Sequence, residues 1–374
     1  MIDKKPFKGY ELSRLGLGAM RLPTKGKEGL IDRKKSLALV DYAYEHGVNY
    51  FDTAYMYHDG KSEKFVGTAL SKYPRESYFL ADKLPIWMCK DAEEMEKVFS
   101  NQIKRTGVAY FDNYLLHSLD RKNWERCKEF GAYEFIKEKQ HEGHIKNIGF
   151  SFHGTIKDLK EIVESYHWDF AQIQLNYLDW ENQDARGQYE ILTNAGIPVI
   201  VMEPVRGGKL ANPADDVKAL FDGNNDNRTY AEWAIRFVAS LPNVVTILSG
   251  MNSISQLENN ISTLTNFEPL TDGEKAVCAE AAKLINKRDV IPCTGCDYCS
   301  DCPKGIKISK IFAIYNEFKN GQATHEESRA NYLALPENVR ANNCINCKKC
   351  TTHCPQNINI PGWMHDGIPK FFNG

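Results

Sequence analysis

Eight of the eleven cysteines lie after residue 292, in two runs that each end in Cys-Pro. The first run holds Cys293, Cys296, Cys299 and Cys302, and the second holds Cys344, Cys347, Cys350 and Cys354. Iron–sulfur clusters take thiolate ligands, and two residues between ligands let one short turn wrap three corners of a cubane. The two runs therefore predict two [4Fe–4S] clusters, and a protein that handles electrons.

The spacing also predicts how the cysteines are shared between the clusters. The second run reads C-x2-C-x2-C-x3-C-P, the bacterial ferredoxin pattern, in which the fourth cysteine ligates the other cluster. The predicted ligand sets are therefore Cys293, Cys296, Cys299 and Cys354, and Cys344, Cys347, Cys350 and Cys302. The first run departs slightly, with two residues before its fourth cysteine. A disulfide framework and zinc are the alternatives, but zinc sites pair only two such cysteines at a time.

Composition excludes several classes of function. The 374 residues carry 47 Lys and Arg against 49 Asp and Glu, a net charge of −2, so nothing indicates a nucleic acid or an anionic membrane as partner. No run of eighteen apolar residues predicts a membrane span, and the N-terminus does not resemble a signal peptide. Cys89, Cys127 and Cys278 are interpreted as ordinary buried thiols, and thiols with clusters indicate a reducing cytoplasm.

The first 285 residues repeat a unit of one strand followed by one helix. Short apolar runs begin at Leu15, Val48, Ser77, Phe111, Ile145, Phe170, Pro198 and Val244, and longer amphipathic stretches lie between them. One of these stretches follows Asp32 as N-cap and stops at Gly47. Eight such units predict a closed parallel (β/α)8 barrel of the TIM type. A doubly wound sheet is the alternative, but GLGAMRLP after the first strand lacks the third glycine of its usual turn.

The barrel is predicted to span residues 1–285, with residues 204–227 as a loop over its mouth. Residues 286–374 are predicted to form a small, mostly α-helical ferredoxin-like domain that holds both clusters. The boundary falls where the sequence becomes rich in cysteine.

Titratable side chains follow three of the predicted strands, where barrel enzymes place their active residues. Asp52, Lys83 and His117 end strands two, three and four, and Tyr57 lies in the loop after Asp52. A single charged residue at a strand end is usually only solvated, but four converge here. We expect Asp52 to pair with Lys83, and the lysine to lower the pKa of Tyr57, which makes Tyr57 a candidate proton donor.

Several segments together resemble the aldo/keto reductase superfamily. They are YFDTAYMYHDGKSEKFVGTAL, LADKLP, NYLLHSLD, IGFSFH, QIQLNYLD and ILSGMNSISQLENNI, and they follow the family order across residues 8–270. The whole chain is similar to the branch of that family with a C-terminal two-cluster ferredoxin domain. The first cysteine run of that branch also reads C-x2-C-x2-C-x2-C-P-x-G-I, as PCTGCDYCSDCPKGI does here, which accounts for its spacing.

The resemblance implies a catalytic tetrad of Asp52, Tyr57, Lys83 and His117. It implies a nicotinamide cofactor, usually NADPH, that delivers hydride to a carbonyl carbon while Tyr57 protonates the carbonyl oxygen. Lys83 and Asp52 would tune Tyr57, and His117 would orient the substrate. The nicotinamide carboxamide would be held by Ser151 and Gln172 and approached by Asn176. His153 stands where the family often has Asn, and its role is left open.

Two departures from the family concern the cofactor. Many members stack a Tyr on the nicotinamide where this chain has Glu203. We interpret the Glu203 side chain as bonding the backbone of the loop that contains Arg206 and Gly207. Glu203, Arg206 and Gly207 are all predicted to contact the cofactor. The family's Lys and Arg at the 2′-phosphate correspond to Ser249 and Gln256. The residues expected to bind this phosphate, mainly through backbone N–H groups, are Ser249, Gly250, Asn252, Ser253 and Gln256, with Asn260 at the adenine. NADPH is expected, and NADH stays open.

Nicotinamides carry two electrons and each cluster carries one, so a flavin adapter is considered. The clusters are interpreted as a relay to a redox partner protein, as a structural tie or as a redox sensor. The leading prediction is a reductase of a small carbonyl compound. The alternative is an electron-transfer protein whose barrel only docks a partner and whose tetrad is vestigial. Four aromatic and apolar side chains after the strands are expected either to line an apolar substrate pocket or only to cap the barrel: Trp87, Met88, Trp124 and Trp180.

Overall fold

The computed structural model describes residues 1–26, 30–224 and 227–373. Contacts are dense within two compact units. The first unit contains Met1–Val205 and Glu232–Lys275, and the second contains Arg206–Ala231 and Ala276–Gly374. Each unit has its own apolar core.

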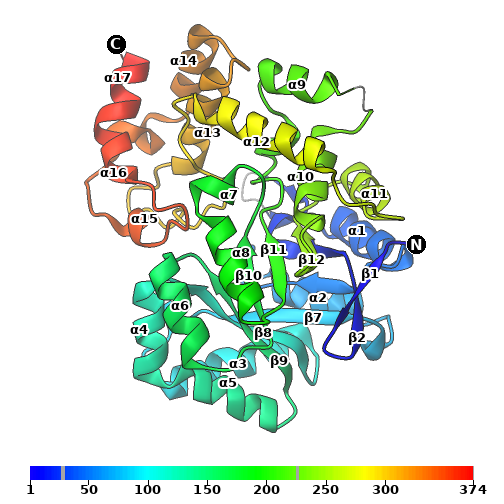
Figure 1. Cartoon of the computed structure of the whole chain (residues 1–374). Coiled ribbons are helices and arrows are strands. Elements are labelled where there is room, and N and C mark those ends of the chain that lie inside the picture. The colour runs from blue at the N-terminus through cyan, green and yellow to red at the C-terminus, as the bar shows by residue number, and fades with distance from the viewer. Residues whose placement is uncertain (27–29, 225–226, 374) are drawn as a thin grey trace. The chain divides into compact units, whose positions relative to one another are not determined.

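A closed barrel of parallel strands forms the centre of the first unit (Figure 1). Its strands in the described residues are β3 (Leu15–Gly18), β6 (Tyr50–Asp52), β7 (Phe79–Leu84), β8 (Phe111–Leu119), β9 (Ile145–Phe152), β10 (Phe170–Gln174), β11 (Val199–Met202) and β12 (Val244–Ser249). The strands pair in chain order, and β12 closes the barrel on β3. The eight predicted strands and the predicted barrel are confirmed.

Alternation along each strand divides the apolar side chains between two layers. On β7, Ala81 belongs to the cluster that fills the barrel interior. Leu80 and Leu84 belong to the larger cluster between the strands and the surrounding helices. Side chains at odd positions of β7 therefore point inward, and those at even positions point toward the helices. This rule places Lys83 inside the barrel and Asp82 outside it.

An N-terminal hairpin, which was not predicted, packs against the start of the barrel strands. It consists of β1 (Lys4–Phe7) and β2 (Tyr10–Ser13), and β4 (Thr24–Lys25) pairs with β5 (Leu30–Ile31) in a second short hairpin. Phe7 and Leu12 are buried in the interior cluster, and Phe7 meets the ring of Phe170 edge to face. The hairpin thus supplies apolar side chains to the N-terminal end of the barrel.

Helices follow the strands and cover the barrel. Those in the first unit are α1 (Arg33–Glu45), α2 (Ser62–Leu70), α3 (Ala92–Thr106), α4 (Arg121–Phe130), α5 (Ala132–His141), α6 (Ile156–Ser165), α7 (Asp179–Asn182), α8 (Ala185–Asn194) and α11 (Ile254–Thr263). Short 3₁₀ turns are η1 (Ala19–Arg21), η2 (Arg75–Ser77) and η3 (Ile86–Met88). The side chain of Asp32 caps α1 by accepting from Lys35 N–H, as predicted.

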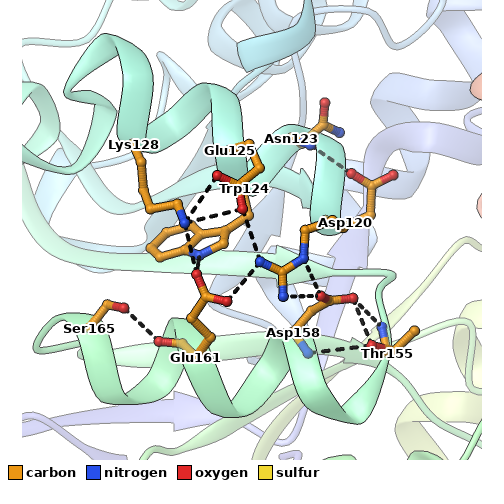
Figure 2. A network of polar contacts seen from close by, with 10 residues as sticks. Asp120, Asn123, Trp124, Glu125, Lys128, Thr155, Asp158, Glu161 and Ser165 are labelled. Carbon is orange, nitrogen blue, oxygen red and sulfur yellow. Dashed lines mark hydrogen bonds and ion pairs between the residues drawn. The ribbon is translucent and has the colours of Figure 1, made fainter.

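A polar network joins α4 to α6 (Figure 2). Arg121 donates to Asp158, to Glu125 and to Glu161, and Lys128 donates to Glu161. The indole of Trp124 donates to Glu161 at 2.8 Å, and its side chain is fully buried. Of the two alternatives for Trp124, this packing favours a structural role over a place in a substrate pocket, because α4 begins at Arg121 and turns Trp124 back onto α6.

The second unit is helical in its described residues. Its elements are η4 (Lys209–Ala211), α9 (Asp215–Asp222), α13 (Ile308–Lys319), α14 (His325–Leu333), η5 (Glu337–Val339), η6 (Ala341–Asn343), α15 (Lys349–Thr352), α16 (Ile360–Gly362), the π-helical turn η7 (Trp363–Gly367) and α17 (Ile368–Asn373). Its core packs Ile311, Phe312 and Tyr315 of α13 against Ile291. The buried side chain of Asn316 bonds both backbone groups of Ile291 at 2.8 Å, which fixes the segment that leads into Cys293.

Two helices, α10 (Tyr230–Ala239) and α12 (Asp272–Asn286), contain points where the chain passes from one unit to the other. The segment predicted as a loop over the barrel mouth holds η4 and α9 and groups with the second unit, so the prediction of a simple loop is wrong. Its residues 225 and 226 lie outside the described residues. The domain boundary between residues 285 and 286 stays a prediction. Among the described residues, no helix combines the length and apolar character that a membrane crossing requires.

Candidate functional site

The C-terminal end of the barrel brings the four predicted tetrad residues together. Asp52 is the last residue of β6, and Lys83 lies near the end of β7 and points inward. The Lys83 ammonium donates to Asp52 Oδ1 at 2.6 Å and to the backbone oxygen of Thr53 at 2.7 Å. Its distance to the phenol oxygen of Tyr57 is 3.4 Å. An ammonium has three donors, so two fix its position and the third can face Tyr57.

Tyr57 reaches this ammonium because the chain turns sharply after β6. Its backbone N–H donates to Ala54, and its carbonyl accepts from Ser62 at the start of α2. The side chain is nearly buried, with a relative exposure of 9%. Its ring meets the ring of His117 edge to face at 6.4 Å, and the Lys83 ammonium lies 5.0 Å from the Tyr57 ring centre.

His117 is aimed by an irregularity in β8. The pairing register between β8 and β9 shifts between Leu116 and Leu119, and Ser118 adopts a left-handed φ of 56°. Such a bulge redirects the side chains beside it. The Ser118 N–H leaves the strand ladder and donates to Ser151 Oγ at 2.7 Å. The bulge therefore couples His117 to one of the predicted cofactor residues.

Burial and neighbouring charge set the protonation of this site. Burial raises the pKa of Asp52, and the Lys83 ammonium opposes that rise, so the ion pair is maintained by the contact itself. Burial lowers the pKa of His117 well below its ordinary value, and the charge of Lys83 and the neighbouring His153 lower it further. His117 is therefore a neutral imidazole near pH 7.

His153 lies just after β9, and its backbone N–H donates to Leu119 at the end of β8. Burial lowers the pKa of His153 to about 4. Its charge is one of the causes that lower the pKa of His117. The His153 side chain itself is half-buried.

The aromatic residues that follow the strand ends lie in different surroundings. Trp87, in η3, places its ring 5.0 Å from that of His117, and the adjacent Met88 is exposed. Trp180, in α7, packs against Tyr189 and Phe237. Trp87 is therefore the aromatic side chain in direct contact with the tetrad, while Trp124 and Trp180 pack between elements.

Two buried polar side chains at the ends of β9 and β10 fit a primary amide. Ser151 and Gln172 are 1% and 2% exposed, and they lie opposite each other in the β9–β10 register. Ser151 Oγ accepts from Ser118, which leaves its hydroxyl hydrogen for another acceptor. Gln172 Oε1 has no donor among the described residues. One unused donor beside one unused acceptor matches the two ends of a carboxamide.

The polar side chains of Asn176 and Glu203 bond other groups of the protein. The Asn176 amide donates to Asp179 and to the Glu203 carbonyl, and its oxygen accepts from the backbone of Leu178 and Asp179. The Glu203 carboxylate pairs with Arg21 at 3.2 Å, and its bond to the following loop stays a prediction. The approach of Asn176 to a nicotinamide stays a prediction. Arg21 was missed by sequence reasoning, although it follows the first strand directly.

The end of β12 and the start of α11 carry the residues predicted at the phosphate and the adenine. Ser253 caps α11 by accepting from Gln256 N–H, and the Gln256 side chain accepts from Asn252 N–H. Asn260 is buried and donates to Ser249 Oγ at 3.0 Å. Gly250 lies against the stem of Arg21, where a β-carbon would come within 2.9 Å of Arg21 Cδ.

These residues form one polar surface at a helix start, and their contact with a nucleotide stays a prediction. Arg206 and Gly207 belong to the second unit, both with left-handed backbone, and their contact with a nucleotide also stays a prediction.

Two cavities in the second unit separate the cysteines into the two predicted sets. One cavity is lined by Cys293, Cys296, Cys299 and Cys354. The other is lined by Cys302, Cys344, Cys347 and Cys350. Ile308 and Ile360 line both cavities and stand between them. The ligand assignment stays a prediction, and this grouping supports it.

The chemistry of the cysteines fits a cluster. All eleven cysteines lie in the described residues and none of them forms a disulfide bond there, so the alternative of a disulfide framework is not supported. Burial raises the pKa of Cys293, Cys299 and Cys354, and a thiolate there needs a bound cation to stabilise it. Cys89, Cys127 and Cys278 are buried, as predicted.

The fold and the site define a barrel protein of the oxidoreductase class with an attached cysteine-rich unit. Residues 14–283 match the model of the aldo/keto reductase family, and residues 292–358 match a 4Fe-4S dicluster domain. The chain belongs to the aldo/keto reductase family and carries a ferredoxin-type domain with eight cysteines.

Relatives and solved structures agree with this assignment. An uncharacterized oxidoreductase of Bacillus subtilis is 26% identical over 75% of this chain and 94% of its own length. The NADH-specific methylglyoxal reductase of Escherichia coli is 24% identical over 74% of this chain and 96% of its own. An aldo-keto reductase from Bacillus halodurans in its holo form aligns with a TM-score of 0.63 at 24% identity, over 75% of this chain and 96% of that one.

Proposed function

We propose that the barrel reduces a small aldehyde or ketone with a reduced nicotinamide nucleotide, and that Tyr57 supplies the proton. The observation that carries the proposal is the buried Lys83 ammonium, held by Asp52 at 2.6 Å and facing the Tyr57 phenol at 3.4 Å. The nucleotide, when bound, supplies a hydride to the carbonyl carbon. Tyr57 O–H gives its proton to the carbonyl oxygen, and the nearby ammonium stabilises the phenolate that remains.

His117 and Trp87 would position the substrate. A neutral imidazole adds no second positive charge beside Lys83, so His117 acts as a hydrogen-bonding group and not as an acid. The contact between its ring and Trp87 places an apolar wall next to it. Such a wall favours a carbonyl compound with an apolar or small substituent, and we propose that class of substrate.

Ser151 and Gln172 would hold the nicotinamide. The Ser151 hydroxyl donates to the carboxamide oxygen, and Gln172 Oε1 accepts from the carboxamide nitrogen. These two contacts would fix one face of the ring toward the carbonyl carbon. Since the pair is buried and already oriented by the bulge at Ser118, little entropy is lost when the ring binds.

The nucleotide is NADPH or NADH in this proposal. An aldo-keto reductase of Klebsiella pneumoniae, with a TM-score of 0.59 at 19% identity over 76% of this chain and 95% of that one, was solved with NADPH, while the Escherichia coli relative is NADH-specific by name. This chain has Ser249 and Gln256 where an arginine fork would grip a 2′-phosphate. We therefore propose weak discrimination between the two nucleotides.

The clusters supply one-electron transfer when bound, and we propose that they connect the protein to a redox partner. The alternative is a docking protein with a vestigial tetrad. The intact contacts of Lys83 with Asp52 and Tyr57 argue against it, since a vestigial site has no reason to keep a buried ion pair. No observation supports a flavin, and the proposal does not include one.

The test is the Tyr57→Phe variant, assayed with small aldehydes and ketones that include methylglyoxal. We expect kcat to fall by about 10²- to 10⁴-fold, the usual contribution of a general acid. Binding of the nucleotide, followed by quenching of protein fluorescence, should not change. Tyr133→Phe is the matched control, because it removes a phenol that bonds His167 on the outside of the barrel. Undiminished reduction by Tyr57→Phe would exclude Tyr57 as the acid.

A further inference from the structure

Two buried carboxyl groups meet on the outer face of β7, directly behind Lys83. Asp82 precedes Lys83 and, by strand alternation, points toward the helices. Glu63 comes from the first turn of α2. Both side chains have zero exposure, and the charge of Glu63 is among the causes that raise the pKa of Asp82, so the two carboxyl groups are neighbours. The tetrad does not use either group.

A count of donors shows what these neighbouring carboxyl groups require. Glu63 Oε2 accepts from Arg105 at 2.7 Å, and Asp82 Oδ1 accepts from the Lys83 backbone N–H at 2.8 Å. The remaining oxygens, Glu63 Oε1 and Asp82 Oδ2, have no donor among the described residues. Two carboxylates only accept, so they repel at contact unless one of them carries a proton. A single proton between the two free oxygens satisfies both.

We propose that Glu63 and Asp82 share one proton and that this acid–carboxylate pair positions the backbone of Lys83. The positioning part rests on the role proposed for Lys83 in reduction. One negative charge remains on the pair, and the Arg105 guanidinium balances it. The pair is therefore neutral overall together with Arg105, although three ionisable groups meet in a buried layer.

The electrostatics agree with this count. Burial raises the pKa of Asp82 well above its usual range, and the charge of Glu63 raises it further, against the opposing effect of Lys83. Burial also raises the pKa of Glu63, and Arg105 opposes that rise. Tyr114 on β8 also faces the pair, and its own pKa is raised by burial and by the charges of Asp82 and Glu63. The proton is accordingly held between Asp82 and Glu63.

Side chains on the outer face of β7 also bond the backbone N–H and the carbonyl of Lys83. Its N–H donates to Asp82, and its carbonyl accepts from Gln102 Nε2 at 2.9 Å. Gln102 is oriented in turn by Tyr114, whose hydroxyl donates to Gln102 Oε1 at 2.5 Å. The end of β7 is therefore fixed from outside, while the ammonium of Lys83 is fixed from inside by Asp52.

Close packing of α2 on α3 makes the arrangement possible. Gly67 of α2 lies so near Thr106 of α3 that a β-carbon there would come within 1.9 Å of the Thr106 oxygen. Without a side chain at this position, the two helices approach closely enough for Arg105 to reach Glu63. Arg105 also lies over the ring of Tyr55, which keeps its guanidinium oriented.

The test for the shared proton is independent of turnover. Infrared spectra of the complete, cluster-loaded protein at pH 7 should show the carbonyl stretch of a protonated carboxylic acid. This band should vanish in both Asp82→Asn and Glu63→Gln, because each amide provides a permanent donor. Asp112→Asn is the matched control and should keep the band, since Asp112 pairs with Arg75 and Lys146 as an ordinary buried carboxylate. A band that persists in both pair variants, or no band in the unaltered protein, would overturn the shared proton.

Stability against pH gives a second readout. The folded pair binds a proton that the unfolded chain releases above about pH 4, so this contribution to stability is lost as pH rises. The unfolding constant of the unaltered protein is divided by that of Asp82→Asn at each pH. This ratio should increase about tenfold per pH unit above about pH 4, until the folded pair deprotonates. A ratio that does not change with pH would contradict the proposal, whether or not the barrel is a reductase.

The positioning role is tested by comparing Asp82→Ala with Asp82→Asn. Alanine removes the acceptor of the Lys83 N–H, so kcat should fall by about tenfold or more with KM little changed, because a small displacement of a catalytic group is costly. Asparagine keeps an acceptor there and should recover most of that loss. Full kcat in Asp82→Ala, or no recovery in Asp82→Asn, would overturn the positioning role and leave the infrared result to decide the shared proton separately.

Discussion

The two units of this chain hold their chemically active groups in opposite ways. In the barrel, the Lys83 ammonium is fixed by Asp52 and by the backbone oxygen of Thr53, and a large apolar core packs on the outer face of the strands. In the second unit, the cysteines line two cavities, and the core that they pack against is much smaller. The contacts of Lys83 are therefore made by protein groups alone, whereas we expect clusters to fill the interior of the second unit. We expect the two units to respond very differently to the same perturbations.

Removal of iron should have the largest effect and should affect only the second unit. Without clusters, the cavities collapse or fill with water, and the small core cannot hold the unit alone. Hydrogen exchange of the iron-free chain should show lost protection in α13 and α14, with β7 and β8 still protected. Cys347→Ser should lower the iron content while Cys127→Ser should not. Protection of α13 that survives complete loss of iron would break the comparison.

Lys83→Met should test whether the barrel site is held by its ion pair. The substitution leaves the buried Asp52 without a cation, which costs about 3–5 kcal/mol when one partner of a buried pair is removed. Urea denaturation should show this loss, and the double variant Lys83→Met with Asp52→Asn should recover most of it. Equal stability of the single variant and the unaltered protein would mean that Asp52 is neutral in the folded barrel.

His153→Asn should weaken the pH dependence of the stability of the barrel. Burial lowers the pKa of His153 from 6.5 to about 4, so the unfolded chain binds more protons between these values. Stability is therefore lost as pH falls below about 6.5, and the variant should be more stable at pH 5 by about 1–2 kcal/mol, with little difference at pH 8. Thermal unfolding at both pH values measures this. A difference that is the same at pH 5 and pH 8 would show that His153 does not titrate on unfolding.

Gln256→Arg should produce a smaller, selective change at the start of α11. Gln256 is exposed, and an arginine there would add a charged donor beside the backbone N–H groups of the helix start. We expect the Kd for NADPH to fall about tenfold, or about 1.4 kcal/mol, with the Kd for NADH nearly unchanged. Gln322→Arg in the second unit is the control for added charge. Equal tightening for both nucleotides would place the 2′-phosphate elsewhere.

The sequence was sufficient for the features that depend on local pattern. Short apolar runs located the barrel strands, and the spacing of cysteines separated them into the two sets that line the cavities. Alternation on β7 already required Lys83 to point inward once its strand was known. The tetrad roles came from the family resemblance, since the strand ends alone offered four polar groups without an order among them.

The features that were missed depend on contacts between distant segments. Trp124 follows a strand end, as pocket residues often do, but α4 turns it onto Glu161 of α6. Arg21 and Glu203 are separated by 182 positions, and no periodicity links them. The pairing of Glu63 with Asp82 depends on how closely α2 packs against α3. Gly67 permits this close packing, but a glycine in the sequence does not by itself predict it. These are consequences of packing, which local sequence patterns do not record.

The most direct test of the central claim follows a labelled hydride through the barrel. Anaerobically purified protein with both clusters would be given NADPH or NADH deuterated at the transferred position, with an excess of a small aldehyde. We expect deuterium on the former carbonyl carbon of the alcohol product. Tyr57→Phe should lower the rate of this transfer by at least about 10²-fold while nucleotide binding persists. An alcohol product without deuterium, or no alcohol from a chain that binds the nucleotide, would contradict hydride transfer in this barrel.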